Sequence, residues 1–303
     1  MKKTPILVCL LLFFLNSFSQ SDTVLIKKHF DEIVNTEKHR NYRNFHTLDS
    51  IALYIRRQLE QYADTAYYQK YKVDGNEYKN VISVFGKHLK RTIIIGAHYD
   101  VCGDQDGADD NASGVIGLLE LARLLKGKPL NYRIELVAYT LEEPPFFRTE
   151  NMGSYRHAKS LFDTKRDVYG MLSLDMIGYF DKTKKSQKFP IGLMSWVYGT
   201  KGDYIMLVNK WGKGKFARRL KRKLKSQNKI KVKSLSGPKS IEGLDWSDHL
   251  NYWNFGYSAS MLTDTGPNRN KNYHRKSDTI ETINIQKMSK VIDAVLEKIL
   301  KMN

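Results

Sequence analysis

Cysteine is nearly absent from this sequence, which contains two cysteines among 303 residues. Cys9 lies in an apolar N-terminal run that we predict to be removed, which leaves Cys102 alone. A chain with one thiol forms no internal disulfide, so a hydrophobic core must provide its stability. About 280 residues are enough to bury such a core in one large domain. We interpret Cys102 as a small, partly buried thiol and not as a metal ligand.

Long apolar runs are also absent once the first twenty residues are set aside. Those residues combine two lysines, the apolar run Ile6 to Leu15 and a short polar exit, which is typical of a secretory signal peptide. The run is short for a membrane span, although a retained anchor is the alternative. We therefore predict a signal peptide at residues 1–20, a single domain at residues 21–303, and export to the periplasm or the medium without stable membrane insertion.

Acidic residues are missing from residues 210–239, in a chain whose formal net charge is +18. Phe216, Leu220 and Leu224 recur every four positions there, so residues 217–226 are predicted to form an amphipathic helix. Its cationic face could bind nucleic acid, anionic lipid or acidic peptides, but we favour a solvated face. Aromatic residues are not interleaved as single-strand binders require, so we predict no nucleic-acid partner.

Hydrophobic periodicity predicts an alternation of strands and helices along the chain. The predicted strands are residues 81–85, 92–97, 134–140 and 170–176, followed by 190–194, 230–234 and 258–262. The predicted helices are an N-terminal helix around residues 48–59, then 113–125, 153–161, 217–226 and 285–300. This alternation favours an α/β fold with one domain and three layers (α/β/α), in which a mostly parallel, mixed sheet is covered on both faces.

Ionisable side chains follow three of the predicted strands. They are His98 and Asp100 after residues 92–97, Glu142 and Glu143 after 134–140, and Asp175 at the end of 170–176. Ligands bind at the carboxyl ends of strands in such sheets. Several carboxylates cannot share a dry pocket in ionised form unless a cation neutralises them. Histidine and carboxylate donors suit zinc in an open catalytic site, so we predict a metal centre at this edge of the sheet.

Five short motifs then carry a resemblance to a known family. They are HYD (98–100), GADDNASG (107–114), EE (142–143), LDM (174–176) and YH…SDT (273–279). Together they resemble the co-catalytic zinc exopeptidases, which include bacterial leucyl aminopeptidases and, more distantly, glutamate carboxypeptidases and zinc glutaminyl cyclases. The resemblance extends from about Asn80 to Thr279. It implies a zinc-exopeptidase fold, two Zn²⁺ ions per chain and a peptide substrate.

The resemblance also implies a ligand set. His98 and Asp175 would bind one zinc ion, and Asp110 would bridge the two ions. Glu143 and His274 would complete the second ion.

Two further roles follow from the resemblance. Glu142 would be the general base that takes a proton from the metal-held water and later gives it to the leaving amine. Asp100 would orient His98 by accepting its remaining N–H. Asp109 and Asn111 are interpreted as loop-shaping residues. Asp248 and His249, in an SDH motif, are assigned a structural role around the site and not metal ligation.

One segment departs from the usual family pattern. Residues 144–152, PPFFRTENM, intervene before Gly153 and Ser154. Our hypothesis is that Phe146 and Phe147 form an apolar wall or lid for the first side chain of the substrate. Packing of both rings into the fold is the alternative.

These features predict a zinc-dependent exopeptidase that acts as an aminopeptidase on peptide N-termini. A zinc glutaminyl cyclase is the alternative enzyme, although that branch works with one zinc ion. A metallocarboxypeptidase would need a basic group for the substrate carboxylate, which Arg148, Arg269 or Arg275 could supply. A non-enzymatic binding module is disfavoured because every ligand position is filled. The sequence leaves the oligomeric state open.

Overall fold

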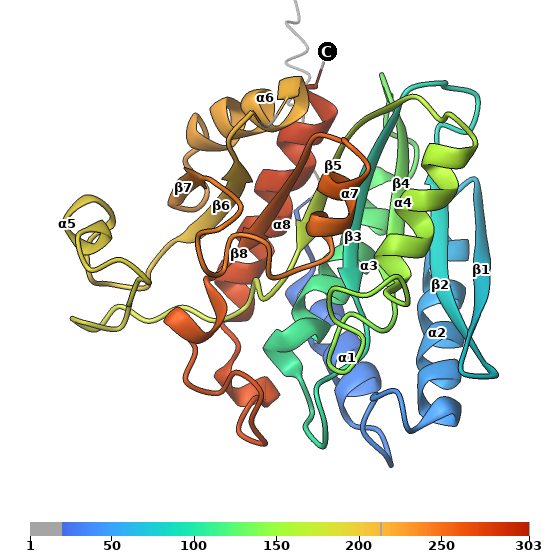
Figure 1. Cartoon of the computed structure of the whole chain (residues 1–303), viewed down its shortest axis with the longest axis horizontal. Helices are drawn as coiled ribbons and strands as arrows, with labels where there is room; N and C mark the ends of the chain where they lie inside the picture. Colours follow the sequence, from blue (N-terminus) through green and yellow to red (C-terminus); the bar gives the residue numbers. More distant parts are fainter. Residues whose placement is uncertain (1–19, 213, 303) are drawn as a thin grey trace, which may run out of the picture.

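An eight-stranded mixed sheet runs through the centre of the molecule, with helices on both faces (Figure 1). The computed structural model describes residues 20–212 and 214–302, so nearly all of the predicted signal peptide lies outside the described residues. The strand order is β1-β2-β4-β3-β5-β8-β6-β7. The strands are β1 (Thr65–Val73), β2 (Asn76–Phe85), β3 (Thr92–His98), β4 (Arg133–Tyr139), β5 (Val168–Leu174), β6 (Ile205–Lys210), β7 (Val232–Gly237) and β8 (Ala259–Thr263).

The four central strands β4, β3, β5 and β8 are parallel, and both outer pairs join this core through antiparallel contacts. β1 and β2 form a hairpin whose turn residues, Asp74 and Gly75, have φ values of 49° and 81°. Both residues are left-handed, as a two-residue type I′ turn requires, and an Asp-Gly pair is suited to it.

Two helical layers cover the sheet. One contains α1 (Thr23–Val34), α2 (Phe45–Glu60), α3 (Gly114–Leu125), α6 (Gly214–Lys225) and α8 (Ile285–Leu300), and the other contains α4 (Gly153–Asp163) and α7 (His249–Asn254). Neighbouring side chains of β3 pack against different helical layers. Ile93 and Ile95 lie in one hydrophobic core, and Ile94 lies in the core on the other face of the sheet. Alternate side chains of a strand point to opposite faces, which is why this central strand is apolar throughout. The predicted three-layer α/β/α fold is thus confirmed.

The predicted elements differ from the observed ones at the edges of the sheet. β1 and β6 were not predicted, and α1 was not predicted either. The predicted strand at residues 190–194 is wrong, because that segment leads into the short helix α5 (Met194–Tyr198) and pairs with no strand. A short apolar run resembles a buried strand by composition, but it becomes one only where a neighbour offers hydrogen bonds. None of the described helices combines the length and apolarity needed to cross a bilayer.

Candidate metal centre and active site

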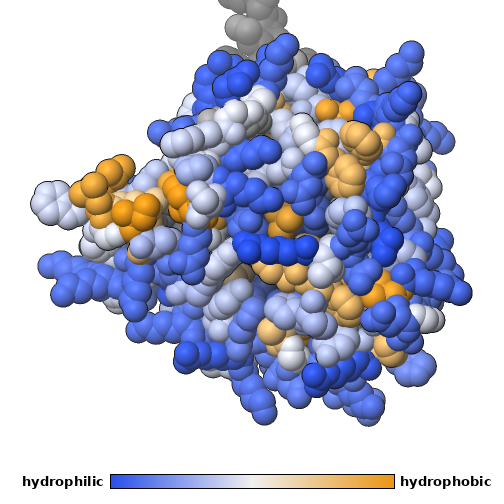
Figure 2. Space-filling model, in the orientation of Figure 1, coloured by the Kyte–Doolittle hydropathy of each residue, from blue (hydrophilic) through white to orange (hydrophobic). Residues whose placement is uncertain are grey.

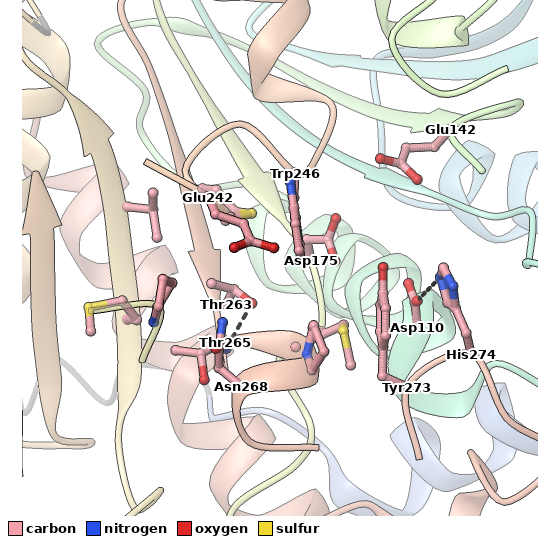
Figure 3. Close-up of a pocket in the computed structure, with 18 of the residues that line it drawn as sticks. Asp110, Glu142, Asp175, Glu242, Trp246, Thr263, Thr265, Asn268, Tyr273 and His274 are labelled. Atoms are coloured by element: carbon pink, nitrogen blue, oxygen red, sulfur yellow. Dashed lines mark hydrogen bonds and ion pairs between the residues drawn. The ribbon is translucent and has the colours of Figure 1, made fainter. Parts of the chain in front are cut away.

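The carboxyl ends of β3, β4 and β5 bring the predicted site residues together. His98 is the last residue of β3, Glu142 and Glu143 follow β4, and Asp175 follows β5. Asp110 lies in the helical turn η1 (Ala108–Ser113), and His274 lies in the loop after η2 (Gly266–Asn268). All are buried except His274, whose side chain is 27% exposed. Figure 3 shows Asp110 facing His274 across the site.

One group of donors surrounds His98. Its Nε2 atom lies 3.4 Å from Oδ1 of Asp110 and 3.7 Å from Oδ2 of Asp175. These three side chains can each offer one atom to a common ion. Their composition, one imidazole and two carboxylates, matches the donor types that zinc prefers in catalytic sites.

A second group of donors surrounds His274. Its Nε2 atom lies 3.2 Å from Oδ2 of Asp110 and 3.2 Å from Oε2 of Glu143. Asp110 therefore directs one oxygen to each group, which is the geometry of a bridging carboxylate. The thiol of Cys102 also lies beside Glu143 and His274, in a third possible donor set. From the sequence, Cys102 is interpreted as a partly buried thiol and not as a ligand, and its nearness to His274, which lies far away along the chain, has no signal there.

Two buried carboxylate oxygens are suited to bind a cation. Oδ2 of Asp110 and Oε1 of Glu143 have no hydrogen-bond partner, although both are shielded from water. His274 approaches Asp110 closely without hydrogen-bond geometry, as two ligands of one ion do. Buried carboxylates without partners are costly, and a divalent cation would satisfy both. The residues present therefore fit zinc.

The protonation equilibria of the cluster indicate the same need for positive charge. Burial, followed by the charge of Asp110, raises the pKa of Glu143 to about 7. Burial likewise raises the pKa of Asp175 to about 6 and that of Glu142 well above its ordinary value. Burial alone would lower the pKa of His98, but the surrounding carboxylates, Glu142 first, raise it. The metal-free cluster thus retains protons where a bound cation would replace them.

Asp100 holds the two glutamates in place. Its carboxylate accepts hydrogen bonds from the backbone N–H groups of Glu142 (3.2 Å) and Glu143 (3.1 Å). β4 ends at Tyr139, and Leu141 has a φ of 60°, so the side chains of Glu142 and Glu143 can turn to one site instead of opposite faces. The Nδ1 atom of His98 lies 3.2 Å from the backbone carbonyl of Asp100 and 3.7 Å from its carboxylate.

The loop that carries Asp110 is held by its acidic neighbours. Asp278 accepts the backbone N–H groups of Asp109 and Asp110, both at 3.0 Å. The Asp109 carboxylate accepts hydrogen bonds from the Gly178 backbone and the Asn270 side chain. Gly107 has a φ of 59°, and an added Cβ would lie 2.4 Å from the Asp110 carbonyl oxygen, so only glycine fits there. Asp109 therefore contacts loop backbone, as the loop-shaping interpretation expects.

The SDH motif lies behind the site. Asp248 is fully buried, and burial raises its pKa to about 7. His249 pairs its Nε2 atom with the Leu244 carbonyl at 2.8 Å, and burial lowers its pKa to about 4. Neither residue lines the cavity that opens from the metal centre.

A cavity of about 400 Å³ opens from the cluster towards β6, β7 and β8. Its far wall is apolar and consists of Phe189, Met206, Val208, Leu235, Trp246 and Met261. Among the described residues that line the cavity, the one carboxylate outside the cluster is Glu242, and none is a lysine or an arginine. Glu242 appears on the far side of Asp175 from His274 in Figure 3. Glu242 and Trp246 had no sequence signal, because they lie in an irregular segment between β7 and α7.

The structure places the two phenylalanines of the predicted cavity wall in different surroundings. Phe147 lines the cavity, but Phe146 is buried against the rings of Tyr42 and Tyr78, with centroids 5.4 and 6.4 Å away. The hypothesis is therefore supported for Phe147, while Phe146 packs into the fold. Two neighbouring side chains leave a turn in different directions, and the sequence does not indicate which one meets the core.

Replacement of these two rings is expected to give opposite outcomes. Phe147→Ala removes part of the cavity wall and should lower kcat/KM for leucyl substrates about ten-fold, with the melting temperature nearly unchanged. Phe146→Ala, its matched control, should cost about 3 kcal/mol of stability because it empties a core position. Aminoacyl reporter substrates and thermal unfolding measure both. Unchanged kcat/KM for leucyl, alanyl and lysyl substrates in Phe147→Ala would refute the wall.

Comparison with known proteins assigns this chain to a family. A model described as Peptidase family M28 matches residues 80–299. The uncharacterized protein YfbL of Escherichia coli (strain K12) is 41% identical over 279 residues, covering 89% of this chain and 85% of YfbL. Leucine aminopeptidase 1 of Emericella nidulans is 28% identical over 217 residues, which are 66% of this chain and 49% of that protein. The chain therefore spans about half the length of this fungal relative.

A solved structure extends the comparison to the fold. The crystal structure of Tannerella forsythia glutaminyl cyclase matches with a TM-score of 0.69 at 19% identity, covering 94% of this chain and 100% of that chain. At this identity the likeness concerns the fold alone.

Together with the family match, the α/β/α fold and the histidine–carboxylate cluster at its strand ends identify a metallo-exopeptidase. The chain belongs to peptidase family M28, which is a zinc-dependent family. The resemblance to the co-catalytic zinc exopeptidases is thereby confirmed.

Proposed function

We propose that this protein is a zinc-dependent aminopeptidase that binds two zinc ions. The observation that carries the proposal is the pair of donor groups that share Asp110. His98, Asp110 and Asp175 would hold one ion, while Asp110, Glu143 and His274 would hold the other. Zinc, when bound, polarises the scissile carbonyl and makes water more acidic.

Glu142 is proposed as the proton carrier of the reaction. Its Oε2 atom lies 3.8 Å from Nε2 of His98, and His98, Glu142 and Glu143 could also offer atoms to one ion, so Glu142 borders both proposed ligand sets. The proposal reserves this carboxylate for the proton. The carboxylate takes a proton from the attacking water as the new C–O bond forms. It then gives this proton to the leaving amine as the C–N bond breaks. Asp100 is proposed to keep Glu142 and Glu143 at the correct distance through its two backbone hydrogen bonds.

The charge of the cavity favours a substrate with a free amine. A carboxypeptidase needs a cation to bind the substrate carboxylate, and the described lining residues supply none. Of the three arginines considered from the sequence, Arg148 pairs with Asp245, and Arg269 is buried against Gln187 and the Tyr204 carbonyl. Arg275 does not line the cavity. The carboxylate of Glu242, the one further charge among the described lining residues, suits an ammonium group and repels a second carboxylate.

The experiment that tests this proposal is a panel of aminoacyl reporter peptides, with free or acetylated N-termini, assayed with and without zinc. We expect release of the N-terminal residue from free-amine substrates alone and none after chelation. Equal cleavage of acetylated substrates would exclude an aminopeptidase.

Glutaminyl cyclase activity is the second candidate, favoured by the full-length match to the Tannerella forsythia cyclase. The complete donor group around His98 argues against this activity. A cyclase that binds one zinc ion does not require a second complete set of metal ligands. Release of ammonia from an N-terminal glutamine, with no amino acid liberated, would reverse this preference.

Glu242 gives the aminopeptidase proposal a prediction on specificity. Its carboxylate stands alone at the apolar wall, so it can accept a lysyl or arginyl side chain whose methylenes contact that wall. Because Glu242 is exposed, we expect Glu242→Gln to lower kcat/KM for lysyl substrates about five-fold. The leucyl substrate is the internal control. An equal loss of kcat/KM with both substrates would show that Glu242 does not recognise the first side chain of the substrate.

A further inference from the structure

A segment whose base borders the active-site cavity through Phe189 exposes apolar side chains on a projection away from that cavity. We name residues 182–202, which contain α5, the projecting arm; α5 stands clear of the sheet at the left of Figure 1. Four of its side chains are largely exposed: Trp196 (87%), Val197 (76%), Leu193 (71%) and Ile191 (50%). Figure 2 shows hydrophobic residues gathered at this end of the molecule. Such clusters on a protein surface mark interaction sites.

The projecting arm is anchored to the body, so this exposure is a property of the fold. The Tyr198 hydroxyl donates to the Ser234 carbonyl of β7 at 3.1 Å, and Lys233 of β7 donates to the Tyr198 carbonyl. The Phe189 ring packs on the Tyr198 ring at a centroid distance of 5.5 Å. The aromatic rings that face the body are thus held, while Leu193, Trp196 and Val197 are presented outwards.

The charge of the projecting arm has one sign. It contains five lysines and no acidic residue. The lysines are Lys182, Lys184, Lys185, Lys188 and Lys201, all of which are exposed. None of them lies in an ion pair with a carboxylate of the described chain. A convex apolar tip with unpaired cations beside it complements a soft, anionic surface, whereas a flat protein partner would leave the tip without a pocket.

We propose that the projecting arm is a peripheral docking site for anionic lipid surfaces. Trp196, Leu193 and neighbouring apolar side chains enter the boundary between headgroups and acyl chains. The lysines contact the lipid phosphates. This binding is reversible, uses exposed side chains that do not line the active-site cavity, and requires no membrane-spanning helix.

The test uses the purified full chain and vesicles of phosphatidylglycerol and phosphatidylcholine, with pure phosphatidylcholine vesicles for comparison. We expect co-sedimentation with the anionic vesicles alone, weakened by salt. The double change Lys184→Glu and Lys185→Glu should weaken binding at least about 20-fold, and Leu193→Ser with Trp196→Ser at least about ten-fold. The matched controls are Lys87→Glu with Lys90→Glu, and Val24→Ser on α1, all exposed positions elsewhere. These controls should bind as the unchanged protein does.

A second readout reports insertion directly. Brominated lipid should quench the fluorescence of the protein on anionic vesicles, and Trp196→Phe should remove most of this quenching. Failure to bind anionic vesicles, or equal losses in the controls, would overturn the proposal. A dimer in sedimentation velocity that Trp196→Ser dissolves would assign the projecting arm to a second copy of the chain, and would also overturn it.

Discussion

Glu142→Gln is expected to lower kcat about 10³-fold while the protein keeps its metal ions. The side chain borders both donor groups, and its only proposed task is to move a proton between water and the leaving amine. Glutamine keeps the size of the side chain but cannot accept that proton. KM should change little, because the proton transfer occurs in the transition state. Steady-state kinetics on a leucyl reporter and elemental analysis of the same sample measure both expectations.

The control for this change is Glu150→Gln, an exposed glutamate in the loop that follows the EE pair. It alters the charge of the chain equally and should leave kcat unchanged. Normal turnover in Glu142→Gln would show that another group carries the proton. Loss of metal in that variant would show instead that Glu142 is a ligand.

Removal of zinc by a chelator is expected to abolish hydrolysis and to lower the melting temperature by about 10 °C. The proposed zinc ions would neutralise a cluster that contains four buried carboxylates and two histidines, and the unfolded chain holds no such site. Zinc should restore both properties, with about two ions bound per chain.

Asp110→Asn removes the shared ligand and should reduce loading at both positions, while the exposed Asp104→Asn should load normally. Full loading of Asp110→Asn would contradict the assigned bridge.

The metal-free protein should also lose stability as the pH rises. The folded-state pKa values of Glu143 (about 7) and Asp175 (about 6) lie above those of the unfolded chain, which are about 4. The folded state therefore binds more protons than the unfolded state between pH 4 and 7, so stability falls across this range. Thermal unfolding of the chelated protein at pH 5 and pH 7.5 measures this effect. In the zinc-loaded protein the metal replaces those protons, and the decline should disappear.

The central sheet and the metal cluster could be anticipated because their determinants are local. Ile93 to Ile95 form a continuous apolar run, and only a strand covered on both faces buries it fully. A histidine or carboxylate at the end of such a run lies at the ligand-binding edge, whatever the rest of the chain does. His98 and Asp175 could be placed in this way, and the motif GADDNASG added Asp110.

The edge of the sheet and the cavity wall could not be anticipated, because they depend on neighbours that are distant in sequence. Residues 190–194 are as apolar as a buried strand, yet no strand lies beside them and the segment projects outwards. Glu242 is one ordinary acidic residue among many until the loop after β7 folds over the site. Its position has no counterpart in periodicity or spacing.

The order of residues alone determined the alternation of strands and helices and the donor types gathered at one edge, since periodicity and strand-end position are properties of consecutive residues. Tertiary structure alone decided that Phe146 enters the core while Phe147 borders the cavity, and that Asp100 holds the backbone of both glutamates. The direction of a side chain after a strand ends depends on which surfaces meet there. Those surfaces come from segments far apart along the chain.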